Sequence, residues 1–343
     1  MKSNLELVAE CDSTPYPNTP AFTELFSDIY TLLHVYPTSP APAIIPIGYI
    51  LPSVFTALAK VPASIKGELE VSRSDRTITA FQQPTEAERS AAVAATCGYW
   101  RAQKTFAVLS GWRDELYPVY GPDNELLFNV ERSASPLFGV VSYGTHMNCY
   151  VRIGAEEQAK EGSKYDMKMW IPRRSRQKQT FGGMLDNGVA GGIASGESPL
   201  ESLIREADEE ASLPEKVVSD NVKAVGTVTY SYLREARAGG ETGLVQPECQ
   251  YVYDLELPVS VIPQPQDGEV EEFYLWTIEE VQKHLALGEF KPNCALVVVD
   301  FFMRHGVLTK ENEKDYDEIW RRCHRELEFP GPHRKVDNLE TKA

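Results

Sequence analysis

Residues 191–213 read GGIASGESPLESLIREADEEASL and join a glycine-rich loop to a helix. Ser198 is a suitable N-cap, Pro199 suits the first helical position, and Glu201 completes a capping box with the serine. The sequence therefore predicts that a helix begins here. Its apolar face is defined by the residues that recur at helical spacing, which are Leu200, Leu203, Ile204, Ala207 and Ala211.

Three acidic residues form a second face of the same helix. Glu206, Glu209 and Glu210 stand at positions i, i+3 and i+4, so their side chains are neighbours. Like charges at these spacings repel by roughly 0.2–0.5 kcal/mol per pair. A divalent cation would reverse the sign of that interaction, because Mg²⁺ takes oxygen ligands and is typically held by carboxylates and substrate phosphates. The alternative is a solvated acidic stripe on a surface helix.

Together with Gly191, Glu197 and Arg205, these glutamates resemble the Nudix box, the loop–helix–loop motif of diphosphate hydrolases. The family pattern is G-x5-E-x7-R-E-U-x-E-E-x-G-U, where U is a bulky apolar residue. Two positions depart from it, since Ala207 is small and Ser212 stands where the pattern has glycine. The serine lies where the chain leaves the helix and where glycine usually eases the backbone, so it affects the shape of the loop more than the chemistry.

Length and charge limit the classes of function. A chain of 343 residues suggests one large or two ordinary domains, and a hydrophobic content of 42% is enough for a sizeable core. Lys and Arg number 34 against 50 Asp and Glu, which gives a net charge of −16. This balance argues against general binding to nucleic acid or to anionic membranes, which needs a basic surface.

Cysteines, histidines and the N-terminus exclude further classes. The six cysteines are scattered without a C-x-x-C pair, which predicts free thiols, and the six histidines lack metal-ligand spacing, so no zinc site is expected. The N-terminus has no apolar segment typical of a secretory signal. Residues 35–59 carry no charge, but five prolines interrupt them, so a membrane-spanning helix is not expected. We therefore expect a soluble, cytoplasmic protein.

Local patterns predict most of the remaining elements. Residues 1–20 are expected to be a loose tail and residues 154–164 a charged turn. Helices are expected at residues 21–34, 53–60, 86–104, 277–288, 295–305 and 316–327. Strands are expected at residues 68–81, 117–132 (a hairpin), 147–153, 167–171, 223–232, 250–257 and 273–276.

Several stretches outside the box resemble the thiamine pyrophosphokinase-related Nudix hydrolases. They are GWRDELYPVY at 111–120, ERSASPLFGVVSYGTHMNCYV at 131–151, WIPRRS at 170–175, LDNGVAGGI at 185–193 and FKPNCALVVVDFFMRHG at 290–306. The resemblance implies an α+β fold, with a mixed β-sheet core between helices in an α/β/α sandwich and an additional N-terminal α+β domain. We expect a flexible tail at 1–20, the accessory domain at 21–138, the Nudix domain at 139–328 and a C-terminal tail at 329–343.

The resemblance also implies an activity, a cofactor and residue roles. The implied activity is the hydrolysis of thiamine diphosphate or its oxidised, damaged oxo and oxy analogues to the monophosphate and phosphate, a form of metabolite damage repair. Mg²⁺ or Mn²⁺ would be held by Glu206, Glu209, Glu210 and the carbonyl of Gly191. Glu206 or Glu209 would act as general base, Arg205 would orient the glutamates, and Glu197 would hold the loop.

A cationic run before the box offers contacts for a diphosphate. Arg173, Arg174 and Lys178 are the candidates, because arginine donates bidentately to phosphate oxygens, although such runs often only solvate a loop. An additional carboxylate could come from Glu269 or Glu272, which an exposed acidic loop would explain equally well. Trp170 or Tyr230 could stack on a substrate ring, but large aromatic residues more often belong to the core.

Other functions remain open at this point. The first is a Nudix hydrolase of another substrate, such as ADP-ribose, a dinucleotide or a nucleoside triphosphate. The second is a non-catalytic module that binds a diphosphate, and the third is a binding or scaffold role in residues 1–135. An isomerase reaction is less favoured, because no cysteine lies in a matching context. The expected partner is a small-molecule diphosphate, with no nucleic acid and no membrane, and either a monomer or a homodimer is compatible with the sequence.

Overall fold

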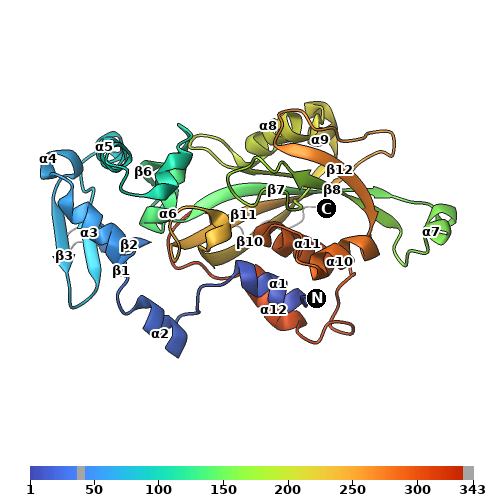
Figure 1. The fold of residues 1–343 in the computed structure, drawn as a ribbon, viewed down its shortest axis with the longest axis horizontal. Coiled ribbons are helices and arrows are strands. Elements are labelled where there is room, and N and C mark those ends of the chain that lie inside the picture. The colour runs from blue at the N-terminus through green and yellow to red at the C-terminus, as the bar shows by residue number, and fades with distance from the viewer. Residues whose placement is uncertain (37–42, 335–343) are drawn as a thin grey trace. The chain divides into compact units, whose positions relative to one another are not determined.

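The computed structural model describes residues 1–36 and 43–334, in which the chain forms two compact units (Figure 1). Unit 1 comprises Met1–Asp12, Tyr143–Tyr230 and Cys249–Arg325. Unit 2 comprises Ser13–Ser142, Ser231–Glu248 and Glu326–Ala343. Each unit therefore draws on separate segments of the chain, whereas the predicted domains were continuous. The predicted domain limits stay predictions, and much of the predicted tail at 329–343 lies outside the described residues.

A six-stranded sheet forms the centre of unit 1. Its strand order is β10-β11-β7-β8-β12, and β9 pairs with β7. β7 is antiparallel to both β8 and β9, and β12 is antiparallel to β8. The strands are β7 (Ser142–Arg152), β8 (Met167–Arg174), β9 (Val189–Gly192), β10 (Val222–Leu233), β11 (Val245–Glu256) and β12 (Val270–Thr277).

Helices cover both faces of this sheet (Figure 1). α8 and α9 lie on one face, and α1, α10, α11 and α12 lie on the other. The arrangement confirms the predicted α/β/α sandwich. The helices of unit 1 are α1 (Asn4–Cys11), α7 (Ala155–Glu161), α8 (Pro199–Ala211), α9 (Glu215–Asn221), α10 (Ile278–Ala286), α11 (Pro292–Arg304) and α12 (Tyr316–Cys323).

The hydrophobic core beneath α8 fixes the position of that helix. Leu203, Ala207 and Ala211 are buried against apolar side chains of β7 and β8, among them Met147 and Trp170. Ala207 is fully buried, so its small side chain brings α8 close to the sheet. In contrast, Leu200 is 40% exposed although the sequence placed it on the buried face.

Two predictions of irregular structure in unit 1 are wrong. Residues 4–11 form α1 where a loose tail was expected, because a capping box between Ser3 and Glu6 begins a helix with one buried side. Asp12 then ends it, fully buried, and accepts a hydrogen bond from Nη1 of Arg325 at 2.9 Å. Residues 155–161 form α7 where a charged turn was expected, since alanine and glutamate are good helix formers.

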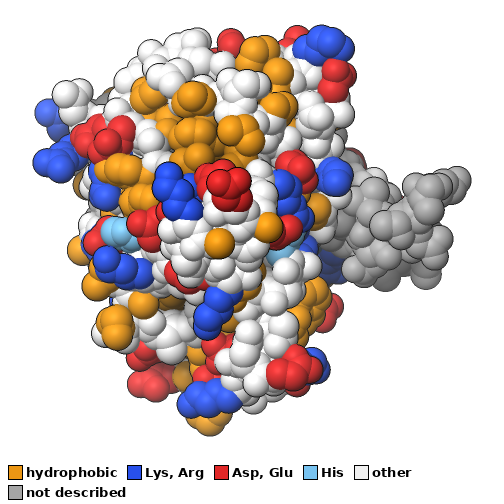
Figure 2. Space-filling view, turned by 90° about the vertical axis from the view of Figure 1, so that its right-hand side faces the viewer, with side chains coloured by type: hydrophobic (Ala, Val, Ile, Leu, Met, Phe, Trp, Pro, Cys, Tyr) orange, Lys and Arg blue, Asp and Glu red, His pale blue; other side chains and the backbone are white. Residues whose placement is uncertain are grey.

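Figure 2 views the molecule from the side on which α7 lies. Acidic and basic side chains are interspersed on the drawn face, with hydrophobic side chains between them. This face therefore lacks a continuous basic surface. Across residues 1–36 and 43–334, none of the helices combines the length and the apolar character that crossing a bilayer requires.

A smaller four-stranded sheet organises unit 2. Its strand order is β2-β1-β4-β3, in which β1 is antiparallel to β2 and parallel to β4. The strands of unit 2 are β1 (Tyr30–Tyr36), β2 (Ala43–Ile50), β3 (Leu69–Ser72), β4 (Thr77–Ala80), β5 (Leu116–Tyr120) and β6 (Leu126–Glu131). Its helices are α2 (Pro20–Phe26), α3 (Pro52–Lys60), α4 (Ala63–Lys66), α5 (Glu86–Ala102) and α6 (Ser135–Phe138).

Most of the helices and strands expected in unit 2 are present, and one expected helix is wrong. The β5–β6 hairpin and α5, with the capping box of Thr85 and Glu88, lie where the sequence predicted them. The helix predicted at residues 21–34 is wrong, because it ends at Phe26 and residues 30–36 form β1. There Tyr30, Leu32 and His34 alternate with less buried residues, which is the period of a strand.

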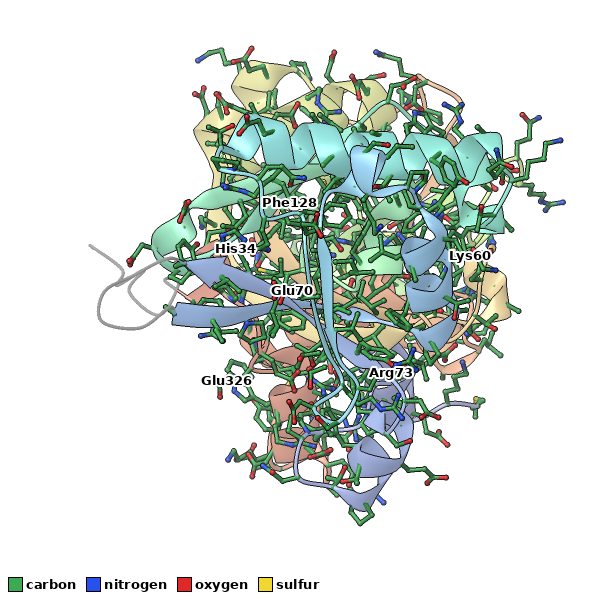
Figure 3. The ribbon with its side chains drawn as sticks, turned by 90° about the vertical axis from the view of Figure 1, so that its left-hand side faces the viewer. His34, Lys60, Glu70, Arg73, Phe128 and Glu326 are labelled. Carbon is green, nitrogen blue, oxygen red and sulfur yellow. The ribbon has the colours of Figure 1, made fainter. Side chains whose placement is uncertain are left out.

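The core of unit 2 lies between its sheet, the β5–β6 hairpin and α5. Figure 3 labels Phe128 of β6 and His34 of β1, which are 1% and 6% exposed, and also Glu70 of β3 and Arg73 directly after it, which are exposed. The unit therefore combines its own sheet, helices and buried core, which confirms the predicted additional α+β domain.

Candidate active site

The start of α8 fixes the direction in which its acidic face points. The side chain of Ser198 accepts a hydrogen bond from the N–H of Glu201 at 3.3 Å, and the Glu201 carboxylate accepts one from the N–H of Ser198 at 2.9 Å. This is the predicted capping box, with Pro199 at the first helical position. Because these two hydrogen bonds fix the residue at which the helix begins, they also fix the helix positions of the glutamates that follow.

Arg205 connects the glutamates of the motif. Its Nε and Nη2 each lie 3.2 Å from an oxygen of Glu197. Its Nη1 lies 2.9 Å from Glu206 and 3.1 Å from Glu209. Glu197 also accepts a hydrogen bond from the hydroxyl of the buried Ser202, which ties the loop to the helix. These contacts place Arg205 where it can orient the acidic face, and its predicted role stays a prediction.

Glu210 is the buried member of the acidic face. Its residue is 7% exposed, and one carboxylate oxygen accepts the N–H of Ala190 on β9 at 3.2 Å. Among the described residues, no cation lies within ion-pair distance of this carboxylate. Burial, followed by the charges of Glu206 and Asp186, raises the pKa of Glu210 well above its usual range. The charge of Lys178 opposes this rise only in part, so the ionised carboxylate is not fully compensated.

Gly191 lets the side chain of Glu206 lie against β9. It pairs with Thr145 of β7, and a Cβ added to it would lie 2.3 Å from Cδ and Oε1 of Glu206. No real Cβ contact is that short. The close approach explains glycine at this position without any ligand. The predicted coordination by its carbonyl stays a prediction.

Arg173 and Arg174 of the cationic run lie on opposite sides of β8. Arg174 is buried, and its guanidinium binds the carboxylate of Asp186. The side chain of Arg173 points the other way, where Nε donates to the hydroxyl of Tyr274 at 3.1 Å and Nη1 to the carbonyl of Gly183 at 2.9 Å. One diphosphate cannot contact both guanidinium groups, because successive side chains of a strand face opposite sides of the sheet.

Lys178 and Glu269 lie together on the side of Glu210. Their side chains form an ion pair, and the charge of Lys178 reaches far enough to lower the pKa of Glu210. Glu272 instead accepts a hydrogen bond from the hydroxyl of Tyr274, on the side of Arg173. Of the two candidates for an additional carboxylate, only Glu269 is paired with a cation whose charge acts on Glu210.

Neither aromatic candidate offers a ring for substrate stacking. Trp170 is 8% exposed and belongs to the core beneath α8. Tyr230 is 1% exposed, and its hydroxyl accepts a hydrogen bond from Nε2 of Gln250 at 3.0 Å. Both rings are part of the core, which was the alternative interpretation of the sequence.

Sequence reasoning missed the buried Asp186, whose charge reaches Glu210. Asp186 binds Arg174 and also accepts hydrogen bonds from the N–H of Asn187 at 2.9 Å and from Sγ of Cys294 at 2.6 Å. Burial opposes its ionisation, but the charges of Arg174 and Lys291 outweigh burial and hold its pKa well below its usual range. The only signal for it in the sequence is its place in the stretch LDNGVAGGI.

Family models match both parts of the chain. Residues 162–294 match the model described as NUDIX domain. Residues 45–142 match the model described as a domain of unknown function, DUF4743. The first match includes all of α8, and the second covers most of the strands of unit 2.

Known proteins resemble the chain over about two thirds of its length. An uncharacterised protein of Saccharomyces cerevisiae, YJR142W, is 41% identical over 232 residues, which are 66% of this chain and 65% of that protein. Nudix hydrolase 20, chloroplastic, of Arabidopsis thaliana is 37% identical over 217 residues, which are 63% of this chain and 53% of that protein. The matched part of the chain thus spans between about half and two thirds of these relatives.

A solved structure also resembles the chain. DR0079 from Deinococcus radiodurans is 20% identical, and the likeness covers 62% of this chain and 100% of that chain with a TM-score of 0.36.

Proposed function

The chain contains a Nudix domain and belongs to the Nudix superfamily, and from this premise we propose that it is a metal-dependent diphosphatase. Such an enzyme cleaves the phosphoric anhydride bond of a small-molecule diphosphate. The observation that carries the proposal is the buried carboxylate of Glu210, which lies beside Glu206 and has no ion pair with a cation among the described residues. A carboxylate in this situation is stabilised by a bound cation.

We propose that the acidic face gathers around a hard divalent cation, since in the described residues its carboxylates do not yet form a close set of ligand atoms. In our proposal Glu206, Glu209 and Glu210, with the carbonyl of Gly191, hold Mg²⁺ or Mn²⁺, since all four supply the oxygen ligands that these ions prefer. When bound, the cation would neutralise diphosphate charge and make water more acidic. The missing Cβ of Gly191 lets the side chain of Glu206 lie against β9, which holds one of the proposed ligands in place.

The remaining steps are performed by side chains of the chain itself. The oxygen of water forms a bond to phosphorus, the bridging P–O bond breaks, and the water proton passes to a glutamate. We favour Glu209 as this base, because its side chain is 47% exposed and that of Glu206 is 13% exposed. A base must come within hydrogen-bond reach of the water it activates. Arg205 would hold both carboxylates in position through its contacts.

Arg174 and Lys178 are the cations that we retain for substrate binding. Both lie on the side of Glu210, whereas Arg173 lies on the opposite side of β8. Each is already bound to a carboxylate, Arg174 to Asp186 and Lys178 to Glu269. Lys178 would exchange Glu269 for a phosphate oxygen. The more buried Arg174 would act by its charge, and Glu269 could then serve as an additional metal ligand.

For the substrate we propose thiamine diphosphate or its oxidised oxo and oxy analogues, which would be cleaved to the monophosphate and phosphate. The support is the resemblance of five stretches to thiamine pyrophosphokinase-related Nudix hydrolases, three of which lie within or beside β7, β8 and β9. We also propose a cytoplasmic location and a small-molecule partner. The mixture of charges on the face in Figure 2 supports the expectation that nucleic acid is not bound.

The decisive experiment measures phosphate release from thiamine diphosphate, both analogues and ADP-ribose, with Mg²⁺, with Mn²⁺ and with a chelator. We expect turnover that requires the divalent ion and is fastest with a thiamine compound. Faster turnover of ADP-ribose would move the proposal to a nucleoside-diphosphate substrate, while turnover that survives the chelator would refute the metal-dependent mechanism.

A glycine pair tests the arrangement of the site. Gly191→Ala places a Cβ against Glu206 and should reduce turnover about 100-fold or more, as expected when positioning of the reacting groups is lost. Gly154→Ala is the matched control, because no atom lies within 4 Å of its added Cβ. Equal activity of the two variants would show that the position of Glu206 against β9 does not matter.

A further inference from the structure

Three buried side chains of unit 1 form a cluster that the proposed reaction does not use. His146 of β7, Asp186 before β9 and Cys294 of α11 are 3%, 5% and 0% exposed. Each offers one potential metal-ligand atom, and these three atoms all lie within 4.8 Å of one another. Among the described residues this is the one such group of histidine, cysteine and acidic side chains.

We propose that His146, Asp186 and Cys294 bind a divalent transition-metal ion of the zinc type, at a site separate from the acidic face of α8. A set of one nitrogen, one oxygen and one sulfur ligand suits zinc, whereas Mg²⁺ prefers oxygen alone. Bonds of about 2.0–2.3 Å around a tetrahedral ion place neighbouring ligand atoms about 3.5 Å apart. The side chains therefore need only small adjustments to surround one ion.

Hydrogen bonds prepare His146 to act as a neutral ligand. The amide nitrogen of Asn187 donates to Oδ1 of Asn148 at 3.1 Å, which leaves the amide oxygen of Asn187 to accept from Nδ1 of His146 at 2.7 Å. Nδ1 therefore carries the proton, and Nε2 keeps its lone pair. Nε2 lies 3.5 Å from Nδ2 of Asn293, at the long limit of a hydrogen bond. Metal-binding histidines typically donate their other ring N–H in this way.

The other two ligands are also held by neighbouring groups. Arg174 binds Oδ2 of Asp186, and Oδ1 of the same carboxylate faces Sγ of Cys294 at 2.6 Å. The Oδ1 atom of Asn293 lies 3.4 Å from the same sulfur and can supply a fourth ligand oxygen. On binding, the ion replaces the thiol proton between Sγ and Oδ1, and this proton passes to solvent.

Nearby cations limit which ions the site accepts. Arg174 and Lys291 both face the cluster, and their charges act on Asp186. Exchange of one proton for a divalent ion adds one positive charge beside them, which opposes binding. An ion must therefore form strong bonds to nitrogen and sulfur to compensate, and this requirement selects zinc-type ions over Mg²⁺.

Cobalt provides the test, because a thiolate bound to Co²⁺ gives an intense near-ultraviolet absorption band that oxygen ligands do not give. The full chain is stripped with a chelator and titrated with Co²⁺ in excess Mg²⁺, which fills the acidic face of α8. We expect a thiolate band that saturates at about one ion per chain, in keeping with the single cluster, and that zinc abolishes by displacement.

Matched cysteine variants identify the ligand. Cys294→Ser should lose the band and about 10-fold or more of the zinc affinity, while Cys249→Ser should keep both, since Cys249 is equally buried but lies on β11 outside the cluster. Glu209→Gln should also keep the band, which separates this site from the proposed catalytic one. A wild-type chain that binds Co²⁺ without a thiolate band would overturn the proposal even if Cys294→Ser failed to fold. Loss of the band in Cys249→Ser would overturn it as well.

Discussion

Buried charged groups are used differently in the two units. In unit 2, Arg89 donates to the carbonyls of Leu127, Gln83 and Pro84, and Lys66 donates to the carbonyl of Val61. These buried cations complete the hydrogen bonds of nearby backbone. They hold loops and helix ends in place, so they carry a structural role. The buried carboxylate of Glu131 in unit 2 also has no ion pair among the described residues, but it accepts the backbone N–H groups of Arg113 and Ser133 and so completes backbone hydrogen bonds as well.

In unit 1, buried charged side chains are bound mainly to other charged side chains. Arg174 binds Asp186, Arg304 binds Asp254, and Arg325 binds Asp12. The paired residues come from distant parts of the sequence, such as Asp12 and Arg325. One buried acid, Glu210, has no such partner among the described residues.

The difference indicates where chemistry is possible in this molecule. A buried charge that completes backbone hydrogen bonds is already satisfied, whereas an unbalanced buried carboxylate is a site at which a cation is stabilised. Perturbed groups of this kind concentrate at functional sites, although structural networks also produce them. The comparison therefore places the chemistry in unit 1, and the following predictions test that inference.

The largest expected effect is on turnover. Glu209→Gln and Glu210→Gln should each lower the rate of diphosphate hydrolysis by about 100-fold to 10,000-fold, the usual range for loss of a general base, with a similar loss expected for a metal ligand. Glu241→Gln in unit 2 is the control, because this carboxylate accepts the N–H groups of Ala107 and Val108. Steady-state phosphate release measures all three. Near-normal turnover of either α8 variant with Mg²⁺ would show that the acidic face of α8 does not carry out the hydrolysis.

The pH dependence of stability should reveal the buried histidine of unit 1. Burial, followed by the charge of Lys291, lowers the pKa of His146 from its usual 6.5 to about 4. The unfolded chain therefore takes up a proton more readily than the folded chain, and stability falls as the pH drops from 6.5 toward 4. At about 1.4 kcal/mol per pH unit, this corresponds to about 3 kcal/mol.

Urea unfolding of the metal-free chain at pH 7 and pH 4.5 measures this effect. His146→Asn should remove about half of the histidine contribution to the difference between the two pH values, since asparagine does not titrate and burial also lowers the pKa of His333 to about 4. Acidic groups elsewhere also titrate over this range, so the comparison is made between the variant and the wild type. An unchanged difference in the variant would show that His146 is not the group responsible.

Replacement of a buried charged residue should change the free energy of unfolding in opposite directions in the two units. Arg89→Met in unit 2 should lower the free energy of unfolding by about 2 kcal/mol, because three carbonyls lose their donor. Glu210→Gln in unit 1 should raise it by about 1 kcal/mol in the absence of divalent ions, because burial opposes ionisation of this carboxylate and glutamine has no group to ionise. Chemical denaturation with a chelator present measures both.

The stability gained on addition of Mg²⁺ tests the same difference between the two variants. A ligand present at about 100 times its dissociation constant stabilises the folded chain by about 2.7 kcal/mol. The wild type and Arg89→Met should gain stability on addition of Mg²⁺, and Glu210→Gln should gain much less. If Glu210→Gln destabilises the chelated protein, its carboxylate is already compensated and the contrast between the units fails.

Much of the fold followed from local sequence signals. The capping boxes at Ser198, Thr85 and Thr277 marked the starts of three helices, because both halves of each motif lie within four residues. The β5–β6 hairpin was equally local. One error arose where two periods overlap, at residues 21–34, where a helical pattern runs into the alternating residues of β1.

The candidate site was predictable only in part. The motif gave the acidic face of α8, but the strand expected at residues 167–171 extends to Arg174, so the alternation that separates Arg173 from Arg174 was not applied. The cluster of His146, Asp186 and Cys294 is formed by register and packing between segments up to 148 residues apart, from 146 to 294, so spacing along the sequence could not reveal it. The expectation of no zinc site relied on such spacing.

The smallest expected effect lies at the end of α8, where Ser212 takes the place of glycine in the family pattern. Its φ of 51° is left-handed, a conformation that costs about 1–2 kcal/mol for residues other than glycine. Its hydroxyl offsets part of this cost by hydrogen bonds to the carbonyl of Gln264 at 3.1 Å and to the side chain of Gln266 at 2.9 Å. Ser212→Gly should therefore raise the free energy of unfolding by less than about 1 kcal/mol, while Ser212→Ala, which keeps the strain and loses both bonds, should lower it by about 1 kcal/mol. Urea unfolding of the two variants beside the wild type gives the order. An alanine variant as stable as the serine would mean that the hydroxyl contacts do not hold this loop, and that the departure from glycine is tolerated for another reason.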